Sequence, residues 1–157
     1  MMDDLSLLAL AVWDEARGES DDGKAAVARV ILNRKRLRYS SDGTMVGTVL
    51  HKDQFSGFWF DMVDGHYTRV CHTLEEAEAR AGTLLAEAIQ SPVWSDCRRI
   101  AGLVSADSYL AEDGYSQMTD AVVLYLNPAI INPAHMPAWA NAQNRVCTIG
   151  RHEFFHA

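Results

Sequence analysis

The stretch Trp13-Asp14-Glu15-Ala16-Arg17-Gly18-Glu19 decides the fold, because it lies between two long apolar segments. Residues 5–12 precede it and residues 25–33 follow it, and both carry apolar side chains at the spacing of buried helices. A carboxylate between two buried helices is costly unless it is paired, hydrogen-bonded or used in chemistry. Glu15 is therefore the first side chain whose surroundings need an explanation.

Length and charge describe one globular domain with no nucleic-acid partner. The chain has 157 residues, enough for one domain with a substantial core and too few for two. Its net charge of −7 argues against nucleic-acid binding, because phosphates need an excess of clustered Lys and Arg. The basic run Arg34-Lys35-Arg36-Leu37-Arg38 falls at the end of an expected helix, where we predict that it complements the helix dipole and is solvated.

The cysteines and the first residues point to a cytoplasmic site of synthesis. Cys71, Cys97 and Cys147 are odd in number and scattered, so we expect thiols rather than a disulfide framework. The apolar run near the start follows Asp3 and Asp4 and lacks a cleavage site, which is not the pattern of a signal peptide. The run is also too short to span a bilayer, so no stable membrane insertion is expected.

The hydrophobic pattern predicts an α+β, mostly α-helical domain with a small β-sheet. Helices are expected over residues 4–17, from about 20 to 38, and over 44–50, 73–90 and 92–110; strands are expected over 121–126 and near 145–149. Residues 111–120 are predicted to form a polar loop. Residues 53–60 are rich in aromatic side chains and interrupted by Gly57, and they form either a sugar-binding loop or a hydrophobic loop on the core.

The last residues, His152-Glu153-Phe154-Phe155-His156, match the HExxH pattern of zinc peptidases. That pattern needs a helix, and Gly150 would break any helix leading into it. No third ligand follows before Ala157, and only an unsupported one, such as His135, precedes it. We therefore expect no metal site, and a zinc peptidase using His152 and His156 is the weaker alternative.

Local chemistry leaves two interpretations of Glu15. Burial at the end of a helix beside Trp13 would disfavour the charged carboxylate and raise its pKa, which suits a proton donor near neutral pH. Alternatively, Glu15 forms an ion pair with Arg17 or Arg29 and has a purely structural role. Glu19, four residues later, is expected to turn away where the helix ends.

Several segments resemble, in the same order, those of the SleB-type cell wall hydrolases, which include spore-cortex-lytic enzymes and related proteins of bacteria and phages. These segments are Glu15-Ala16-Arg17-Gly18-Glu19 with residues 23–34, Gln54-Phe55-Ser56, Tyr125-x-Asn127-Pro128, and Ile149-Gly150-Arg151-His152-x-Phe154. The resemblance covers nearly the whole chain and assigns His152 to a closing family motif, so that the HExxH match arises by chance. Residues 73–90 look like extra length, and Leu126 stands where the family has an aromatic residue.

The resemblance implies a lysozyme-like catalytic domain over residues 1–157 that cleaves the β-1,4 bond between N-acetylmuramic acid and N-acetylglucosamine in peptidoglycan. As in a lytic transglycosylase, a carboxyl group would protonate the glycosidic oxygen, and the 6-hydroxyl of the same sugar would close a 1,6-anhydro ring. Hydrolysis by water, as in a muramidase, is the alternative. The implied roles are Glu15 as catalytic acid, Gln54, Ser56, Tyr125 and Asn127 as cleft-lining residues, Trp59 as a stacking wall, and Glu19 as the residue that holds the turn. No cofactor is implied.

The expected partners are the glycan strands of peptidoglycan, and a monomer is expected. Lack of a signal peptide favours a phage endolysin that is made in the host cytoplasm and released by a holin to act on periplasmic peptidoglycan. A wall-binding or virion structural protein that keeps the fold without catalysis is the alternative from another functional class.

Overall fold

A computed structural model describes residues 2–111 and 114–157. The described residues contain the α-helices α1 (Asp4–Ala16), α2 (Asp21–Leu37), α3 (Met45–Val49), α4 (Leu74–Ile89) and α5 (Trp94–Ser105). They also contain the strands β1 (Phe60–Val63), β2 (His66–Arg69), β3 (Val122–Leu126), β4 (Arg145–Ile149) and β5 (His152–His156), with short 3-10 turns between elements. The predicted α+β, mostly helical architecture is confirmed.

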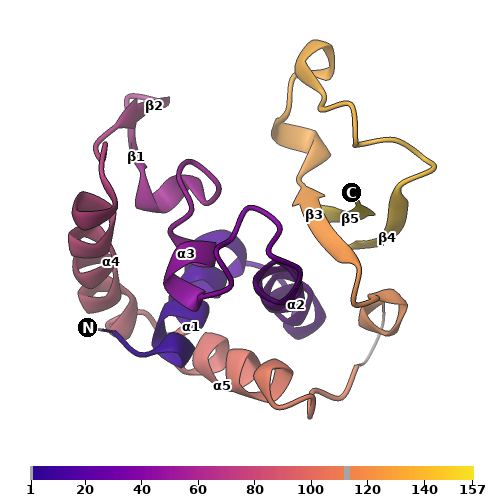
Figure 1. Ribbon diagram of the computed structural model, residues 1–157, viewed down its shortest axis with the longest axis horizontal. Coiled ribbons are helices and arrows are strands. Elements are labelled where there is room, and N and C mark those ends of the chain that lie inside the picture. Colours follow the sequence, from indigo (N-terminus) through magenta and orange to yellow (C-terminus); the bar gives the residue numbers. More distant parts are fainter. Residues whose placement is uncertain (1, 112–113) are drawn as a thin grey trace.

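Helix α1 lies at the centre of the molecule, in contact with α2, α3, α4 and α5 (Figure 1). Its residues from Leu7 to Trp13 are all buried, as expected for a helix that is apolar on every side. The Asp3 side chain caps its start by accepting a hydrogen bond from the Ser6 amide at 2.7 Å, and Ser20 caps α2 in the same way. The last turn of α1, which carries Glu15, therefore lies inside the fold.

A three-stranded antiparallel sheet in the order β3-β5-β4 packs beside α2. The Asn33 side chain of α2, which is buried, donates hydrogen bonds to the backbone carbonyls of Thr119 and Val122 at 3.0 and 2.9 Å. This double contact fixes the start of β3 on the helix and thereby places Tyr125 facing the end of α1. The predicted strands at 121–126 and 145–149 are confirmed, and β5 between them is an addition that the sequence pattern did not predict.

An antiparallel hairpin of β1 and β2 projects from the helical part of the molecule (Figure 1). Its turn residues Asp64 and Gly65 both have positive φ angles, 50° and 79°, which is the geometry of a tight two-residue hairpin turn. The sequence analysis did not predict this hairpin, although an Asp-Gly pair is a known signal for a tight hairpin turn.

Two further outcomes concern the predicted boundaries. Helix α5 ends at Ser105 rather than near residue 110, because Asp107 adopts a left-handed backbone conformation with φ of 52°. Of the predicted polar loop 111–120, residues 112 and 113 lie outside the described residues.

The cysteines and the helices bear on the expected environment of the protein. Cys71, Cys97 and Cys147 are all free and buried. Within residues 2–111 and 114–157, no helix has the length and apolar character needed to cross a bilayer.

Candidate active site

Glu15 lies where the end of α1 meets β3. Its carboxyl group forms a hydrogen bond with the Tyr125 hydroxyl. Burial raises the pKa of Glu15 to about 7, and the neighbouring Asp14 carboxylate adds to the rise. The hydrogen bond from Tyr125 and the charge of Arg34 act in the opposite direction because they favour the carboxylate. The predicted rise in the pKa of Glu15 is confirmed.

The alternative that Glu15 forms an ion pair with Arg17 or Arg29 is wrong. Arg17 donates a hydrogen bond to the Trp13 carbonyl at 3.2 Å, and its guanidinium lies over the Trp13 ring. Arg29 is paired with Asp107 at 2.8 Å. Among the described ion pairs of the chain, none joins Glu15 to either arginine.

Arg34 is a site residue that the sequence analysis placed incorrectly on the solvated surface. It is only 6% exposed, and its Nε donates a hydrogen bond to the Val123 carbonyl of β3 at 2.6 Å. Its Nη1 donates to the Gln54 side-chain oxygen at 3.2 Å. Helical spacing from the buried Ile31 and Val30 was the signal that could have placed Arg34 on the inner face of α2. A buried guanidinium here provides positive charge near Glu15.

Glu19 connects the turn after α1 to the turn between β4 and β5. Its carboxylate accepts hydrogen bonds from the Arg151 backbone amide at 2.9 Å and from Arg151 Nε at 3.0 Å, and His152 Nδ1 lies 3.6 Å away. Burial opposes the ionisation of Glu19, but the Arg151 hydrogen bonds outweigh it and lower its pKa. The His152 ring in turn packs edge-on against Tyr125 with centroids 5.1 Å apart. Glu19 thus supports, through His152, the strand that holds Tyr125.

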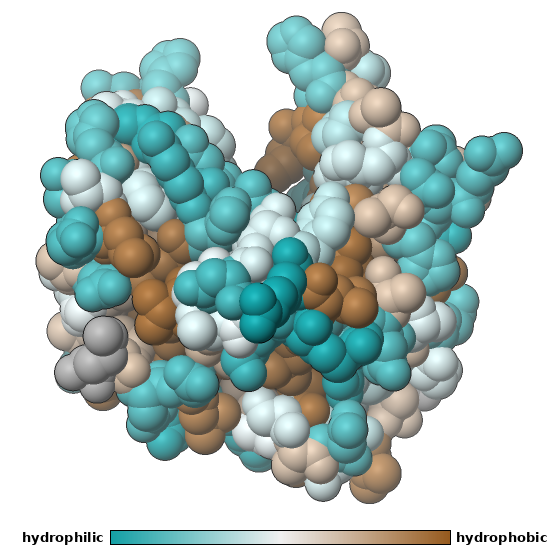
Figure 2. Space-filling view, in the orientation of Figure 1, coloured by the Kyte–Doolittle hydropathy of each residue, from teal (hydrophilic) through white to brown (hydrophobic). Residues whose placement is uncertain are grey.

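Glu15 borders a polar groove of about 370 Å³. The groove runs between the end of α1, the 3-10 turn at residues 56–58, the β1–β2 hairpin and α4; its lining is Trp13, Asp14, Glu15, Arg17, Ser56, Gly57, Phe60, Asp61, Met62, Tyr67, Arg80, Leu84 and Glu87. A Cβ atom added to Gly57 would overlap the Asp14 carboxylate, so the backbone approaches this acid closely only because residue 57 is glycine. The molecular surface is also hollowed between the hairpin side and the β3 side (Figure 2).

Two of the four residues predicted to line the cleft lie at the site, and the other two do not line the groove of Glu15. Ser56 lines the groove with Glu15, and Tyr125 contacts Glu15 directly. Gln54 is exposed and is linked to the site through Arg34, whereas the Asn127 side chain accepts a hydrogen bond from the Ala129 amide and caps a 3-10 turn.

The prediction that Trp59 forms a stacking wall is wrong. Trp59 is only 2% exposed and belongs to the hydrophobic core, and it is not among the residues that line the groove of Glu15. The 53–60 segment therefore packs Phe55, Phe58 and Trp59 inward, as the hydrophobic-loop interpretation predicted, while Ser56, Gly57 and Phe60 line the groove.

Comparison with known proteins identifies the family of this chain. The sequence matches the family described as Cell Wall Hydrolase over residues 18–155. The chain belongs to that family. As a cell wall hydrolase it is a peptidoglycan-cleaving enzyme. The matched range begins three residues after Glu15, so the case for this carboxylate rests on its surroundings in the fold.

The fold of this cell wall hydrolase is similar to that of a solved structure, the catalytic domain of the germination-specific lytic transglycosylase SleB from Bacillus anthracis. The two share 21% sequence identity with a TM-score of 0.59, over 97% of this chain and 93% of the other. The predicted lysozyme-like α+β fold is thereby confirmed. A search of curated proteins found no match.

The HExxH segment of the hydrolase is a strand, not a helix. Residues i and i+4 of a strand are about 13 Å apart, too far for both to bind one zinc ion. His152 is buried beside Glu19, while Nε2 of His156 forms a hydrogen bond with the Thr119 hydroxyl at 3.1 Å. The zinc-peptidase alternative is therefore wrong for this segment, and in the part of the chain that the structure describes no group of three or more ligand side chains could hold a metal.

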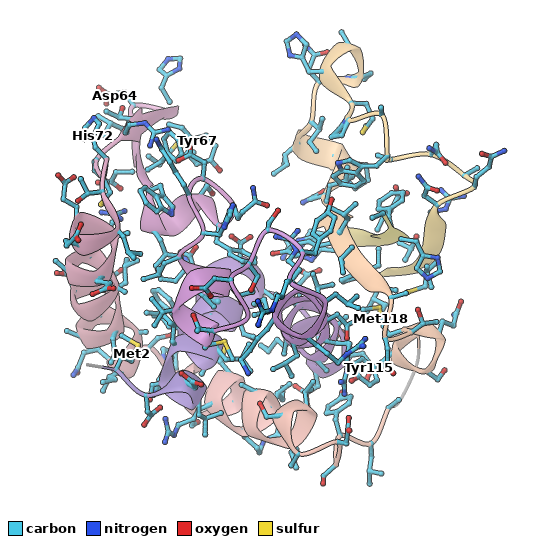
Figure 3. All side chains as sticks on the ribbon, viewed as in Figure 1. Met2, Asp64, Tyr67, His72, Tyr115 and Met118 are labelled. Carbon is cyan, nitrogen blue, oxygen red and sulfur yellow. The ribbon has the colours of Figure 1, made fainter. Side chains whose placement is uncertain are left out.

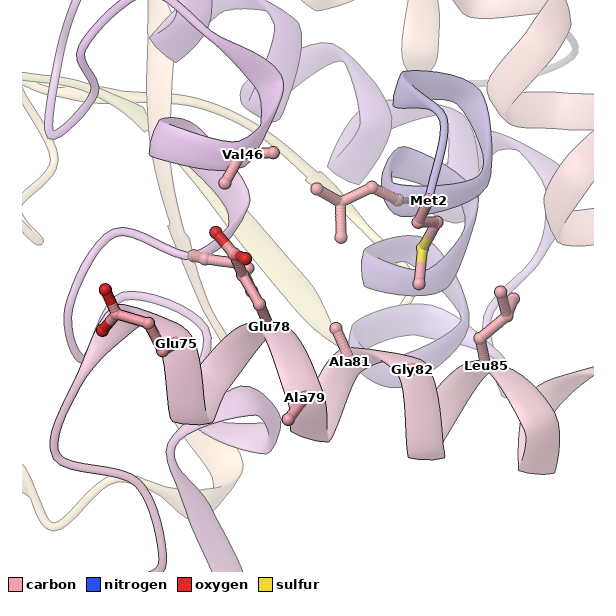
Figure 4. A pocket seen from close by; sticks show the side chains of 10 residues that line it. Met2, Val46, Glu75, Glu78, Ala79, Ala81, Gly82 and Leu85 are labelled. Carbon is pink, nitrogen blue, oxygen red and sulfur yellow. The ribbon is translucent and has the colours of Figure 1, made fainter.

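A second cavity, of about 470 Å³, lies between α4, α3 and the start of α1 (Figure 4). Its walls are mainly apolar, with Glu75 and Glu78 at α4 and Met2 and Leu7 on the opposite side. Glu15 and Tyr125 are not part of this lining, so the cavity is separate from the candidate active site.

Proposed function

We propose that this cell wall hydrolase cleaves the glycan strand of peptidoglycan between N-acetylmuramic acid and N-acetylglucosamine as a lytic transglycosylase, with Glu15 as the catalytic acid. The observation that carries the proposal is a half-buried glutamate at the edge of a polar groove, whose pKa is raised by desolvation to about 7. Such a group holds a proton near neutral pH and can still release it, which is what general acid catalysis requires.

In the first step the protonated Glu15 donates its proton to the glycosidic oxygen. The bond between that oxygen and the anomeric carbon breaks, and an oxocarbenium-like state develops on the muramic acid ring. Glu15 is then a carboxylate, and the Tyr125 hydrogen bond and the positive charge of Arg34 both favour this form. The site is therefore arranged to hold the acid protonated before cleavage and to stabilise the anion after it.

In the second step the carboxylate of Glu15 accepts the proton of the sugar 6-hydroxyl while that oxygen bonds to the anomeric carbon. This closes the 1,6-anhydro ring and restores the protonated acid. Because the nucleophile belongs to the same sugar, its attack needs positioning but no second carboxylate.

The position of Asp14 supports the alternative that the enzyme is a hydrolytic muramidase. Its carboxylate lines the same groove, and burial raises its pKa despite the nearby Arg17 and Arg80. In a muramidase a second carboxylate would activate water or stabilise the oxocarbenium ion. Glu19 is a weaker candidate for this work because Arg151 already engages its oxygens.

Mass spectrometry of digested peptidoglycan tests the proposal. Anhydro-muropeptides are expected; reducing muramic acid ends would instead establish a muramidase, and cleaved stem peptides would refute glycan cleavage. Glu15→Gln is the matched control, because it keeps the shape of the side chain and removes the exchangeable carboxyl proton. If this variant released fragments as fast as wild type, Glu15 would not be the acid, and release by neither protein would favour a binding or structural role.

We also propose, from the resemblance to wall hydrolases of phages, that the protein acts in host lysis after a holin opens the membrane. Expression in a Gram-negative host with and without a co-expressed holin tests this role. Lysis only with the holin is expected, and lysis without it would contradict the dependence.

A further inference from the structure

The β1–β2 hairpin turns large exposed side chains toward the groove of Glu15. Met62 and Tyr67 are paired across the two strands, and both line that groove. Tyr67 is 62% exposed and Met62 is 53% exposed, whereas most large apolar side chains of the chain are in the core. Figure 3 shows Tyr67 on this projecting arm.

The hairpin is held firmly at its base, which fixes where the Tyr67 ring lies. Arg80 of α4 donates hydrogen bonds to the Gly57 carbonyl at 2.7 Å and to the Phe60 carbonyl at 3.0 Å. Arg69 lies over the Phe60 ring and is paired with Asp53 at 2.8 Å. Phe60 therefore has a fixed position between the base and the arm.

The Tyr67 ring packs against this fixed Phe60 side chain. It forms a T-shaped contact with Phe60, with ring centroids 6.4 Å apart, and still remains 62% exposed. An isolated two-stranded ribbon is only marginally stable in water, so large exposed side chains on this one suggest a use other than folding.

We propose that Tyr67 is a substrate-positioning residue whose ring stacks on a sugar of the glycan strand next to the bond that Glu15 cleaves. This inference rests on the proposed function. The C–H faces of a pyranose are apolar and flat enough to cover an aromatic ring, while the sugar hydroxyl and acetamido groups need polar partners. The groove offers both, with Tyr67 and Met62 on the arm and Ser56, Asp61 and Arg80 around it.

Position in the groove distinguishes Tyr67 and its strand partner Met62 from exposed apolar residues elsewhere on the surface, and Tyr67 is the one of the two with an aromatic ring. Leu110 and Ile130 are more exposed, at 86% and 77%, but neither lines the groove of Glu15. Trp59, the aromatic residue expected from the sequence to stack on sugar, is in the core. Tyr67 takes the role that Trp59 cannot fill.

The test compares four variants of the full chain: Tyr67→Ala, Tyr67→Leu, Tyr67→Trp and Tyr67→Phe. Thr68→Ala is the matched control, because Thr68 is the next residue on the same strand, points to the opposite face and is not in the groove lining. Two measurements are made for each: kcat and KM on soluble glycan fragments, and sedimentation with purified peptidoglycan in a Glu15→Gln background, where no turnover occurs.

We expect Tyr67→Ala and Tyr67→Leu to raise KM and weaken sedimentation on the order of tenfold, with a smaller effect on kcat, because a stacked ring is worth about that factor. Tyr67→Phe, Tyr67→Trp and Thr68→Ala should stay close to wild type.

Three results would overturn the inference: Tyr67→Ala behaving as wild type, Tyr67→Leu binding as well as Tyr67→Trp, or Tyr67→Phe failing as badly as Tyr67→Ala. The second would show that apolar bulk suffices, and the third that the hydroxyl acts rather than the ring. If wild type cleaved no glycan, the proposed function would fail on its own, and sedimentation would still decide whether Tyr67 binds the strand.

Discussion

Replacing Glu15 by glutamine is expected to stabilise the folded protein above neutral pH while it abolishes cleavage. Burial and the neighbouring Asp14 raise the pKa of Glu15 from 4.5 to about 7. The folded state thus holds this proton more tightly than the unfolded chain does, so the stability that the proton contributes to the wild type is lost as pH rises from about 4.5 through about 7. Because a tenfold change in an ionisation constant corresponds to about 1.36 kcal/mol, the whole loss is on the order of 3 kcal/mol.

Glu15→Gln does not ionise and so escapes this loss. Near pH 4 the variant and wild type should unfold at similar temperatures. Above pH 8 the variant should unfold roughly 6–12 °C higher, since a chain of this size gains about 2–4 °C per kcal/mol. Cleavage should fall by about 10²–10⁴-fold at every pH, the usual contribution of a general acid.

Thermal unfolding followed by circular dichroism from pH 4 to pH 9 at constant ionic strength measures the effect. Glu87→Gln is the matched control, because it removes one negative charge from an exposed position in the same groove and so corrects for the change in net charge. The reasoning would be refuted if Glu15→Gln and Glu87→Gln followed the same pH dependence, or if the difference in unfolding temperature between Glu15→Gln and wild type did not grow between pH 4.5 and pH 8.

Three more predictions follow from the contacts around Glu15. Tyr125→Phe removes a hydrogen bond that favours the carboxylate of Glu15, so the pKa of Glu15 should rise and the alkaline limb of the pH–activity profile should move to higher pH. Dye release from labelled peptidoglycan at a series of pH values measures the profile, and an alkaline limb that did not move would contradict the contact. Glu19→Gln weakens the hydrogen bonds from Arg151 and should lower the free energy of unfolding by about 2 kcal/mol. Urea unfolding measures this, and a curve with the same midpoint and slope as wild type would show that the link between the two turns contributes little to stability. Because His152 and His156 lie on a strand, a chelator should leave the cleavage rate unchanged, and loss of activity that zinc restores would disprove this.

Local chemistry predicted most of the helices well. The helices predicted to start near residues 20 and 73 are capped by Ser20 and Thr73, and each of these side chains accepts a hydrogen bond from an amide in the first turn of its helix. Capping depends on neighbours three residues away, so it is visible in the sequence. Strand β5 was missed because the HExxH match suggested a different structure, although its partner β4 directly precedes it in the chain; only its other partner, β3, lies further away.

Two side chains show where residue type alone misleads. Arg34 was expected to be solvated because it is basic and lies at a helix end, yet it is buried against β3. Trp59 was expected to face sugar because it is aromatic, yet it fills the core. In both cases the neighbours that decide burial come from other segments of the chain. A strand must pack on α2 before Arg34 is enclosed.

The sequence by itself determined that Glu15 would sit between two largely apolar helices, because apolar periodicity is a local property of the chain. It left open whether the carboxyl group of Glu15 holds a proton or forms an ion pair with an arginine. Only the tertiary structure decided which groups surround it. Tyr125 arrives from a strand far along the chain, and Glu19 meets Arg151 across 132 residues. Such contacts depend on how helices and strands pack, and spacing within any one element does not encode them. The same packing put Tyr67, rather than Trp59, in the groove that Glu15 borders.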